Sequence, residues 1–301
     1  MILILGSGLI GGTLAKQFET RKIPFKIFSR TKPSFLLRPF DFREGLWQDI
    51  EKHADFFYNV ETVIHTISTT VPASSMQNKI QDAIENIETN IKLLDICVNY
   101  GVKNLLFISS GGAIYGIPQQ AVVDETHPTY PISSYGITKL TTEKYLYLYQ
   151  LHYGLKTVCL RPSTVYGIGQ TTHKPQGVVA HIIKAIREQR SFTVWGDGFG
   201  KKDYLYVDDL IEAIFCIVDK NFETQHSIYN LAFGKSYSIR EIIHLVEFYT
   251  GKKLFVNYEA AKPFDIPSIA LQSERFKKEF GWQPHVDLSE GIQKILNSTT
   301  L

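Results

Sequence analysis

Short runs of apolar residues alternate along this chain with longer segments in which apolar residues recur every three to four positions. The runs are typical of buried strands, and they comprise Ile2–Leu5, Phe25–Phe28, Thr62–Ile67, Leu105–Ser109 and Thr157–Arg161. The longer segments have the spacing of helices, and they are Leu9–Thr20, Ile80–Tyr100 and Ser134–Tyr153. This alternation predicts an α/β fold with a Rossmann-like, doubly wound parallel sheet, whose ligands bind beyond the carboxyl ends of the strands.

After Gly167 the pattern changes to shorter elements, separated by glycine and proline at 175–177, 196–200 and 262–263. We therefore expect two lobes. The predicted dinucleotide-binding domain covers residues 1–167, and the chain returns to it at 205–230. A smaller C-terminal substrate lobe is predicted from 168–204 and 231–301.

The first predicted strand leads directly into a glycine turn with the GxGxxG spacing of a dinucleotide fingerprint, formed by Gly6, Gly8, Leu9, Ile10 and Gly11. Gly6 permits the tight turn, and Gly8 lets backbone N–H groups approach a pyrophosphate. Gly11 allows the following helix to pack closely on the strand. Because the N-terminus of that helix offers unpaired N–H donors to an anion, the position of the turn predicts an NAD(P) site.

The second predicted strand ends in Arg30, without the carboxylate that NAD enzymes place on the ribose 2′-hydroxyl. A guanidinium makes charge-assisted hydrogen bonds with phosphate oxygens, so Arg30 favours NADP, with NAD as the alternative cofactor. The alternative interpretation of Arg30 is a solvated arginine at a strand end. Asp41 and Phe42 are candidates for contacts with the adenine.

Tyr135 and Lys139 lie one helical turn apart on the same face of the predicted helix 134–153. An ammonium beside a phenol favours the phenolate, so we expect the pKa of Tyr135 to be lowered toward neutrality, as a proton donor and acceptor for a sugar hydroxyl requires. Tyr249 and Lys253 have the same spacing at a predicted helix end. The spacing alone therefore does not identify the site.

Charge and composition narrow the class of protein. The net charge is only +2 and the basic residues are scattered, so neither nucleic acid nor an anionic membrane is an expected partner. No apolar stretch has the length of a membrane span, and the start lacks a basic leader. Three cysteines within apolar runs fit small buried side chains in a reducing cytoplasm. The nine histidines lack metal-ligand spacing, so no metal is predicted, and His65 is expected to be buried with its hydrogen bonds satisfied.

Taken in order, these motifs resemble those of one family, the extended short-chain dehydrogenase/reductases that modify nucleotide sugars. The resemblance covers nearly the full chain and includes the glycine turn, Asn90, Ser109 with Ser110, Tyr135 with Lys139, and the motifs at 161–167, 195–198, 202–210, 229–231 and 280–284.

The resemblance implies roles for residues throughout the chain. Tyr135 would be the catalytic acid/base, Lys139 would tune it and hold the nicotinamide ribose, and Ser110 would assist them. The further implied cofactor contacts are Thr66, Ile67, Ser68, Asn90, Ser109 and Pro162. The implied contacts with a nucleotide-sugar substrate are Gly111, Thr164, Trp195, Lys202 and Lys262. A homodimer through the helices around 80–100 and 134–153 is also implied.

Departures from the family pattern restrict the chemistry. Gly111 occupies the position of the usual catalytic serine or threonine, so the second hydrogen bond to the reacting oxygen comes from Ser110, from the substrate or from water. Residues 112–113 are Gly-Ala where family dehydratases carry Asp-Glu, which disfavours dehydration and decarboxylation. Lys202 and Lys262 stand where relatives often use arginine on the diphosphate, and a lysine keeps the charge but loses the bidentate fork. Asp265 is expected to hold Lys262.

Three hypotheses of function follow. The first is NADPH-dependent reduction of a 4-keto nucleotide sugar, with hydride delivered to C4, in the synthesis of sugars for bacterial surface polysaccharides. The second is an NAD-dependent C4 epimerase of a UDP-sugar. The third, suggested by Gly111, is a cofactor-binding sensor or scaffold without catalysis.

Overall fold

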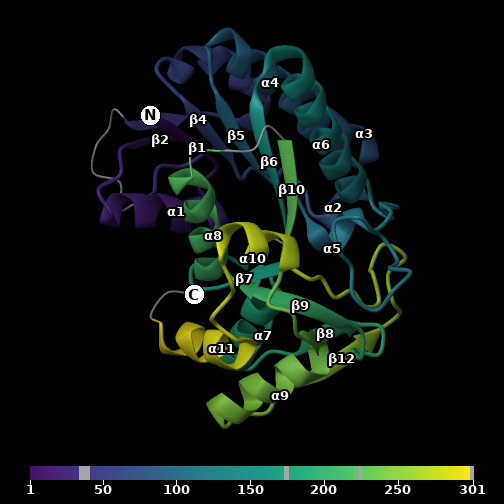
Figure 1. Cartoon of the computed structure of the whole chain (residues 1–301). Helices are drawn as coiled ribbons and strands as arrows, with labels where there is room; N and C mark the ends of the chain where they lie inside the picture. Colours follow the sequence, from purple (N-terminus) through teal and green to yellow (C-terminus); the bar gives the residue numbers. More distant parts are fainter. Residues whose placement is uncertain (34–40, 173–175, 221, 223–225, 299–301) are drawn as a thin grey trace. The chain divides into compact units, whose positions relative to one another are not determined.

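The computed structural model describes residues 1–33, 41–172, 176–220, 222 and 226–298. Its main sheet has seven strands in the order β10-β6-β5-β4-β1-β2-β3 (Figure 1). Their bounds are β1 Ile2–Leu5, β2 Phe25–Ser29, β3 Phe42–Glu44, β4 Thr62–His65, β5 Asn104–Ile108, β6 Lys156–Pro162 and β10 His226–Leu231. Every pairing from β3 to β6 is parallel, which confirms the predicted fold class.

The order of the strands places the glycine turn at the ligand-binding position of such a sheet. β1 pairs with β2 on one side and with β4 on the other, so the strand order reverses at β1. In doubly wound sheets, ligands bind at the carboxyl ends of the strands beside this reversal. The turn that follows β1 lies there.

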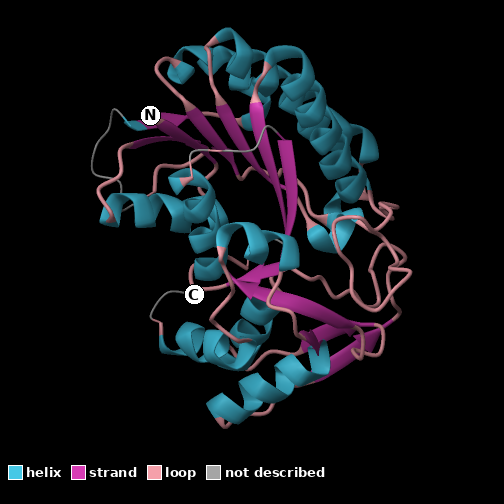
Figure 2. Cartoon of the chain, in the orientation of Figure 1, coloured by secondary structure: helices cyan, strands magenta, loops and turns pink. Residues whose placement is uncertain are grey.

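Helices cover both faces of the main sheet (Figure 2). The helices in the first half of the chain include α1 Leu9–Thr20, η2 Trp47–Phe57, α2 Pro72–Ser75, α3 Lys79–Ala83, η3 Ile84–Glu88, α4 Thr89–Asn99 and α6 Ser134–Tyr153. The successive side chains of β1 point to opposite faces of the sheet, and both faces are covered. As a result no surface is exposed at Leu3, Ile4 or Leu5. The bounds predicted for α1 and α6 are confirmed. Ser133 caps the start of α6, and Gly154, with φ 69°, ends it.

The helix predicted over 80–100 is interrupted in its first half. α3 gives way to a π-helical turn, η3, before α4 begins at Thr89. The amide Nδ2 of Asn86 donates to the backbone carbonyl of Asp82 at 3.1 Å and to its carboxylate at 3.0 Å, and Nδ2 of Asn90 donates to the carbonyl of Asn86. Side chains that hydrogen-bond within the helical ladder produce such an interruption, which apolar spacing does not reveal.

The remaining elements lie largely in the C-terminal half. They are α5 Gly111–Ile114, β7 Thr164–Tyr166, α7 Val178–Arg187, β8 Phe192–Trp195, β9 Lys201–Tyr206, α8 Val207–Asp219, β11 Ser236–Ser238, α9 Ile239–Thr250, β12 Val256–Glu259, α10 Glu274–Phe280 and α11 Leu288–Asn297. Two small sheets have the orders β11-β9-β7 and β12-β8. Residues from α7, α9, α11 and β9 share one apolar core.

The chain divides into two compact units. The first comprises 1–110, 133–161 and 214–229, and the second comprises 111–132, 162–213 and 230–301. This division differs from the predicted domain bounds chiefly at 111–132, which lies in the second unit. The reason is that Tyr115 and Val123 are buried in a cluster with Ala232, Ile266 and Leu271 of the C-terminal part. No helix among the described residues combines the length and the apolar character needed to cross a membrane.

Candidate active site

The glycine turn after β1 is shaped to receive an anion. Gly6 has φ +101°, where residues with a Cβ are strained. A Cβ on Gly11 would lie 2.1 Å from the carbonyl oxygen of Gly6. Gly8 is exposed, and a Cβ added there would meet nothing within 4 Å. Because no side-chain hydrogen bond caps α1, the N–H groups of its first turn, which includes Leu9 and Ile10, are available to a pyrophosphate.

The loop after β4 supports this turn. Oγ1 of Thr66 donates to the carbonyl of Leu5 at 2.8 Å and would lie 2.6 Å from a Cβ on Gly11. Ile67 and Ser68 follow and are partly buried. Thr66 therefore holds the glycine turn against β4, and the cofactor contacts predicted for these three loop residues stay predictions.

The end of β2 presents a cation. Ser29 is buried, and its hydroxyl donates to the carbonyl of Thr31 at 2.7 Å. Arg30 is exposed and forms no ion pair with another residue that the structure describes. Asp41 and Phe42 are partly buried at the start of β3, next to β2. The guanidinium is thus accessible to a phosphate at the strand adjoining the glycine turn, and its preference for NADP stays a prediction.

The three residues predicted to be catalytic are neighbours at the carboxyl end of β5. Nζ of Lys139 lies 5.9 Å from the centroid of the Tyr135 ring, one turn away on α6. The side chain of Ser110 hydrogen-bonds with the Tyr135 hydroxyl. The buried Lys139 ammonium donates to the carbonyl of Ile108 at 2.8 Å, which ties α6 to β5. Ser110 thus provides a hydroxyl at the phenol although Gly111 has none.

The prediction of a lowered pKa for Tyr135 is wrong. The pKa of Tyr135 is raised to about 12, mainly because the phenol is buried. The charge of Asp82 adds to this rise, and the hydrogen bond with Ser110 opposes it. Burial also lowers the pKa of Lys139 to about 7, although the nearby carboxylates of Glu143 and Asp82 act to raise it. A lysine with that pKa is only partly charged at neutral pH, so it does not outweigh the desolvation of the phenol. Tyr135 is therefore protonated at neutral pH.

The Ser109 hydroxyl indicates a ligand at the same place. It is buried and makes no hydrogen bond with any described residue. A buried polar group without a partner costs about 1–3 kcal/mol, so such a group calls for a ligand or water. Together with the open space over Gly8 and the uncapped start of α1, it fits NAD(P). Residues 6–11 would hold the pyrophosphate, and Ser109, Tyr135 and Lys139 would face the nicotinamide ribose.

His65 and Asn90 form a buried connection beneath the site. The N–H of Ile67 donates to Nδ1 of His65 at 3.3 Å, so Nε2 carries the proton and donates to Oδ1 of Asn90 at 2.7 Å. Nδ2 of Asn90 donates to the carbonyl of Asn86 and, at 3.0 Å, to Oγ1 of Thr142. Burial lowers the pKa of His65 to about 3. The prediction of a buried, hydrogen-bonded His65 is confirmed, whereas the cofactor contact of Asn90 stays a prediction.

Several polar residues that support the site were not predicted. Oγ of Ser75 accepts a hydrogen bond from the backbone N–H of Tyr135 at 3.0 Å. Glu143 and Arg161 form a buried bidentate ion pair with distances of 3.0 and 2.6 Å. Asp82 is completely buried. For Asp82 and Glu143, the sequence signal that could have found them is a charged residue on the inward face of a helix. That signal can be used only when it is known which face of the helix is buried.

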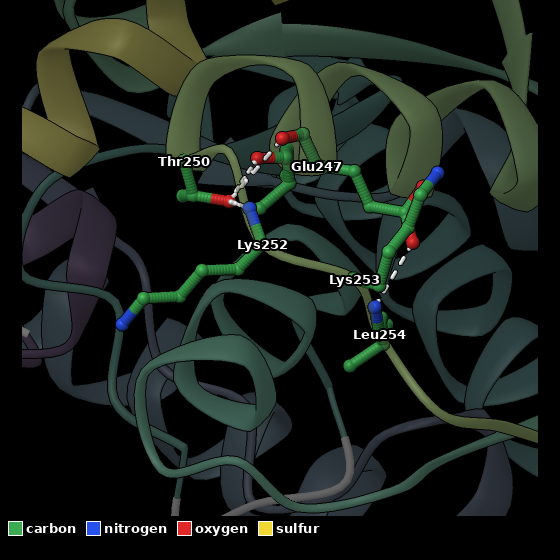
Figure 3. Close-up of polar contacts among 6 residues, drawn as sticks. Glu247, Thr250, Lys252, Lys253 and Leu254 are labelled. Carbon is green, nitrogen blue, oxygen red and sulfur yellow. Dashed lines mark hydrogen bonds and ion pairs between the residues drawn. The ribbon is translucent and has the colours of Figure 1, made fainter.

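The second tyrosine–lysine pair does not form a comparable arrangement. α9 ends at Thr250, and Gly251 follows with φ 66°, so Tyr249 and Lys253 are not on one continuous helix. Figure 3 shows Lys253 turned toward Glu247, whose carboxylate accepts from Nζ at 2.8 Å and from the N–H of Leu254 at 2.9 Å. This lysine therefore forms an exposed ion pair beside the end of α9.

The second unit carries the predicted substrate contacts. Gly111 begins α5 and is buried, Thr164 begins β7 and is partly buried, and Trp195 ends β8 with 37% of its surface exposed. Pro162, a predicted cofactor contact, is buried at the end of β6. The contacts predicted for these residues stay predictions.

The two lysines of the second unit are held differently from the prediction. Asp265 forms an ion pair with Lys202 and not with Lys262. The N–H of Asp265 donates to the carbonyl of Lys262 at 3.0 Å in a turn, and the carboxylate reaches the adjacent β9. Nζ of Lys262 instead lies 5.2 Å from the centroid of the Trp195 ring, a cation–π distance.

The chain is similar in sequence to enzymes of nucleotide sugars. The chain is 30% identical over 303 residues to a dTDP-4-dehydro-6-deoxyglucose reductase of Escherichia coli, a match that covers 97% of this chain and 95% of that protein. It is 32% identical over 241 residues to a putative UDP-glucose 4-epimerase of Methanocaldococcus jannaschii, covering 80% of this chain and 77% of the relative.

The fold is also similar to those of solved structures. A UDP-glucose 4-epimerase of Thermus thermophilus in complex with NAD matches with a TM-score of 0.89 and 28% identity, and covers 99% of both chains. A UDP-glucose 4-epimerase of Thermotoga maritima with UDP-glucose matches with a TM-score of 0.88 and 29% identity, covering 98% of this chain and 96% of that one. The model of the NAD dependent epimerase/dehydratase family matches residues 2–232. The chain therefore belongs to the NAD-dependent epimerase/dehydratase family.

Proposed function

We propose that this protein reduces a 4-keto nucleotide sugar with NADPH, and that Tyr135 donates the proton. The observation that carries this proposal is the match to the Escherichia coli 4-keto-sugar reductase, which extends through both compact units. In the proposed reaction, hydride adds to C4 and a proton adds to the oxygen of the former ketone, which gives a hydroxyl. The product would serve the synthesis of bacterial surface polysaccharides.

The side chains at the end of β5 fit the proton transfer. NADPH, when bound, supplies the hydride. Tyr135 is the proposed proton donor because its phenol, which hydrogen-bonds with Ser110, is protonated at neutral pH. Ser110 hydrogen-bonds with the phenol and takes the place of the hydroxyl absent from Gly111. Lys139 holds the nicotinamide ribose, with its Nζ already fixed at the carbonyl of Ile108.

The preference for NADP rests on Arg30. Its guanidinium is exposed at the end of β2, beside the glycine turn, where a 2′-phosphate would approach. Replacement of Arg30 by Asp is expected to raise the Kd for NADPH at least about tenfold, or 1.4 kcal/mol, and to leave the Kd for NADH within about threefold. Both Kd values are measured by titrating the protein with each cofactor and following the quenching of protein fluorescence. Equal losses for the two cofactors would contradict the role of Arg30.

In the second unit, Lys202, Lys262 and Trp195 are the proposed contacts with the nucleotide diphosphate. Lys202 and Lys262 supply the positive charge, and the half-exposed ring of Trp195 offers a surface for stacking. Gly111 and Thr164 would complete the contacts with the substrate.

The activity is tested by mixing the purified protein with NADPH and 4-keto-6-deoxy sugars activated by dTDP, UDP, GDP or CDP. We expect loss of the absorbance of reduced nicotinamide with one of them. Tyr135→Phe is the matched control, because it removes one oxygen atom, and it should lower kcat about 100-fold or more. Unchanged absorbance with every nucleotide would refute the reductase.

A C4 epimerase of a UDP-sugar is the second candidate, favoured by the epimerases among the relatives and the structural matches. It oxidises C4, turns the ketone and returns the same hydride to the other face, so it needs no added reductant. Cofactor that remains bound through gel filtration, together with exchange of UDP-glucose and UDP-galactose without added coenzyme, would identify this activity. Cofactor that washes out readily favours the reductase.

We also propose a cytoplasmic homodimer. α3, η3 and α6 are in contact, and they expose large apolar side chains at Ile80, Ile84, Ile137, Leu148 and Leu151. An exposed apolar surface on adjacent helices is typical of a protein–protein interface. A second copy of the same helices would cover it by two-fold symmetry.

A further inference from the structure

Tyr135 lies in the first turn of α6, the part of a helix that frays most readily. The N–H groups of a first turn have no partners within their own helix. The hydroxyl of the cap residue Ser133 accepts from a different N–H, that of Gly136, at 3.2 Å. The backbone of Tyr135 is therefore held only if another segment of the chain supplies an acceptor.

The hydroxyl of Ser75 at the end of α2 supplies that acceptor. Its oxygen accepts a hydrogen bond from the backbone N–H of Tyr135 at 3.0 Å, and Ser75 has no exposed surface. The same hydroxyl donates to the carbonyl of Pro72 at 2.9 Å. Because this second bond fixes the direction of the hydroxyl hydrogen, a lone pair of the oxygen faces Tyr135. Both serine and tyrosine belong to the first compact unit.

The segment that ends at Ser75 also supports the glycine turn. At its start, Oγ1 of Thr66 donates to the carbonyl of Leu5, the last residue of β1, at 2.8 Å. In its middle, the Asn86 amide donates to Oγ1 of Thr69 at 2.8 Å and accepts from the N–H of Thr69 at 3.3 Å. One short segment therefore connects the turn proposed to hold the pyrophosphate with the helix turn that carries the proposed proton donor.

The phenol depends on this connection more than its neighbour Lys139 does. Lys139 lies one turn farther along α6, and its Nζ is also held at the carbonyl of Ile108 at 2.8 Å. Tyr135 has no such depth in the helix, so a loosened first turn displaces its side chain. A displacement of about 1 Å at a reacting group can cost about 100-fold in rate.

We propose that Ser75 is a positioning residue for the reaction: its hydroxyl holds the backbone of Tyr135, so that the phenol keeps a fixed place relative to a cofactor on the glycine turn. The functional half of this inference rests on the proposed function, in which Tyr135 donates the proton. The hold on the backbone can be tested without substrate or turnover.

The test is hydrogen exchange of the Tyr135 amide, followed by NMR in protein labelled with ¹⁵N-tyrosine and assigned by the loss of its signal in Tyr135→Phe. In Ser75→Ala, exchange at Tyr135 should become at least about tenfold faster, because its N–H loses its acceptor. The increase should exceed that at Tyr149, whose exchange reports on opening of the whole helix. Ser74→Ala is the matched control, because the Ser74 hydroxyl hydrogen-bonds with the backbone of Val71 at the start of α2. It should leave exchange at Tyr135 within about threefold of the wild-type rate.

Kinetics separate positioning from mere stabilisation. With an active substrate, Ser75→Ala should lower kcat at least about tenfold and leave KM and the Kd for NADPH within about threefold, since it removes no contact with either ligand. Ser74→Ala should keep kcat within about threefold. If Ser75→Ala does not fold, Ser75→Cys serves instead, because a thiol is similar in size but a weaker acceptor. It should change exchange and kcat in the same directions, each by at least about threefold.

Wild-type exchange at Tyr135 in Ser75→Ala would overturn the inference, whether or not any sugar is reduced. Faster exchange with an unchanged kcat, or equal losses of kcat in Ser74→Ala and Ser75→Ala, would make Ser75 purely structural and also overturn it. Failure of both Ser75 variants to fold, with Ser74→Ala folded, would have the same consequence. Faster exchange at Tyr135 without reduction of any 4-keto sugar would reject the proposed function and keep the hold on Tyr135, whose effect on kcat would then be measured on epimerisation.

Discussion

Replacing two glycines of the turn after β1 separates the stability of the fold from the binding of cofactor. A Cβ on Gly11 would lie 2.1 Å from the backbone oxygen of Gly6, and relief to 3.0 Å requires a separation of about 0.9 Å between helix and turn. Overpacking against backbone costs about 3 kcal/mol, and the better helix propensity of alanine returns about 1 kcal/mol. Gly11→Ala should therefore lower the free energy of unfolding by about 2 kcal/mol.

Gly8→Ala is the matched variant, because a Cβ at Gly8 meets nothing within 4 Å and the φ of −69° suits alanine. Alanine is a poorer N-cap than glycine, but it also restricts the unfolded chain, and these effects offset to within about 1 kcal/mol. The methyl group would nevertheless stand where a pyrophosphate approaches α1. We expect the Kd for NADPH to rise at least about tenfold, or 1.4 kcal/mol.

Urea denaturation without cofactor measures stability, and titration with NADPH followed by fluorescence measures affinity. The expected pattern is a destabilised Gly11→Ala and a stable Gly8→Ala that binds NADPH weakly. A Gly8→Ala protein with wild-type affinity would show that the anion does not sit over this turn. A Gly11→Ala protein as stable as the wild type would show that helix and strand are not in the close contact described.

Three other perturbations test the interior and the surface of the first unit. Glu143→Gln leaves the guanidinium of Arg161 buried without its carboxylate. It should lower the free energy of unfolding, measured by urea denaturation, by about 3–5 kcal/mol. The double variant Glu143→Gln with Arg161→Met should lose less, and equal losses would contradict a buried ion pair. The pKa of His65 is lowered from 6.5 to about 3, so as the pH falls the unfolded chain takes up a proton before the folded chain does. The free energy of unfolding should therefore fall as the pH drops from 6.5 toward 3. His65→Gln should flatten this pH dependence, and an unchanged slope would show that another group causes it. Leu148→Glu puts a charge on the exposed apolar face of α6 and should convert the proposed dimer to monomer in sedimentation velocity. Lys278→Glu, at an exposed position of α10 in the second unit, is the control, and a dimer that persists in Leu148→Glu would exclude this face.

The amino-acid sequence determined five of the seven strands of the main sheet, the glycine turn and the bounds of α1 and α6, because apolar spacing and capping act over a few residues; β3 and β10 were not predicted. Helical spacing put Tyr135 beside Lys139, and the resemblance to the family, not a local pattern, brought Ser110 to the same site. The interruption at η3 was decided by tertiary structure, because the Asn86 and Asn90 amides bond within the ladder only when that face is buried.

Ionisation was likewise decided by tertiary structure. Spacing puts Lys139 beside Tyr135, but desolvation depends on everything packed around the phenol, and it raises the pKa that the spacing alone predicted to fall. The partner of Asp265 also could not be read locally, because Lys202 on β9 is distant in sequence. Local sequence pattern determines which residues can come into contact, and burial in the tertiary structure determines their pKa values and hence their charge.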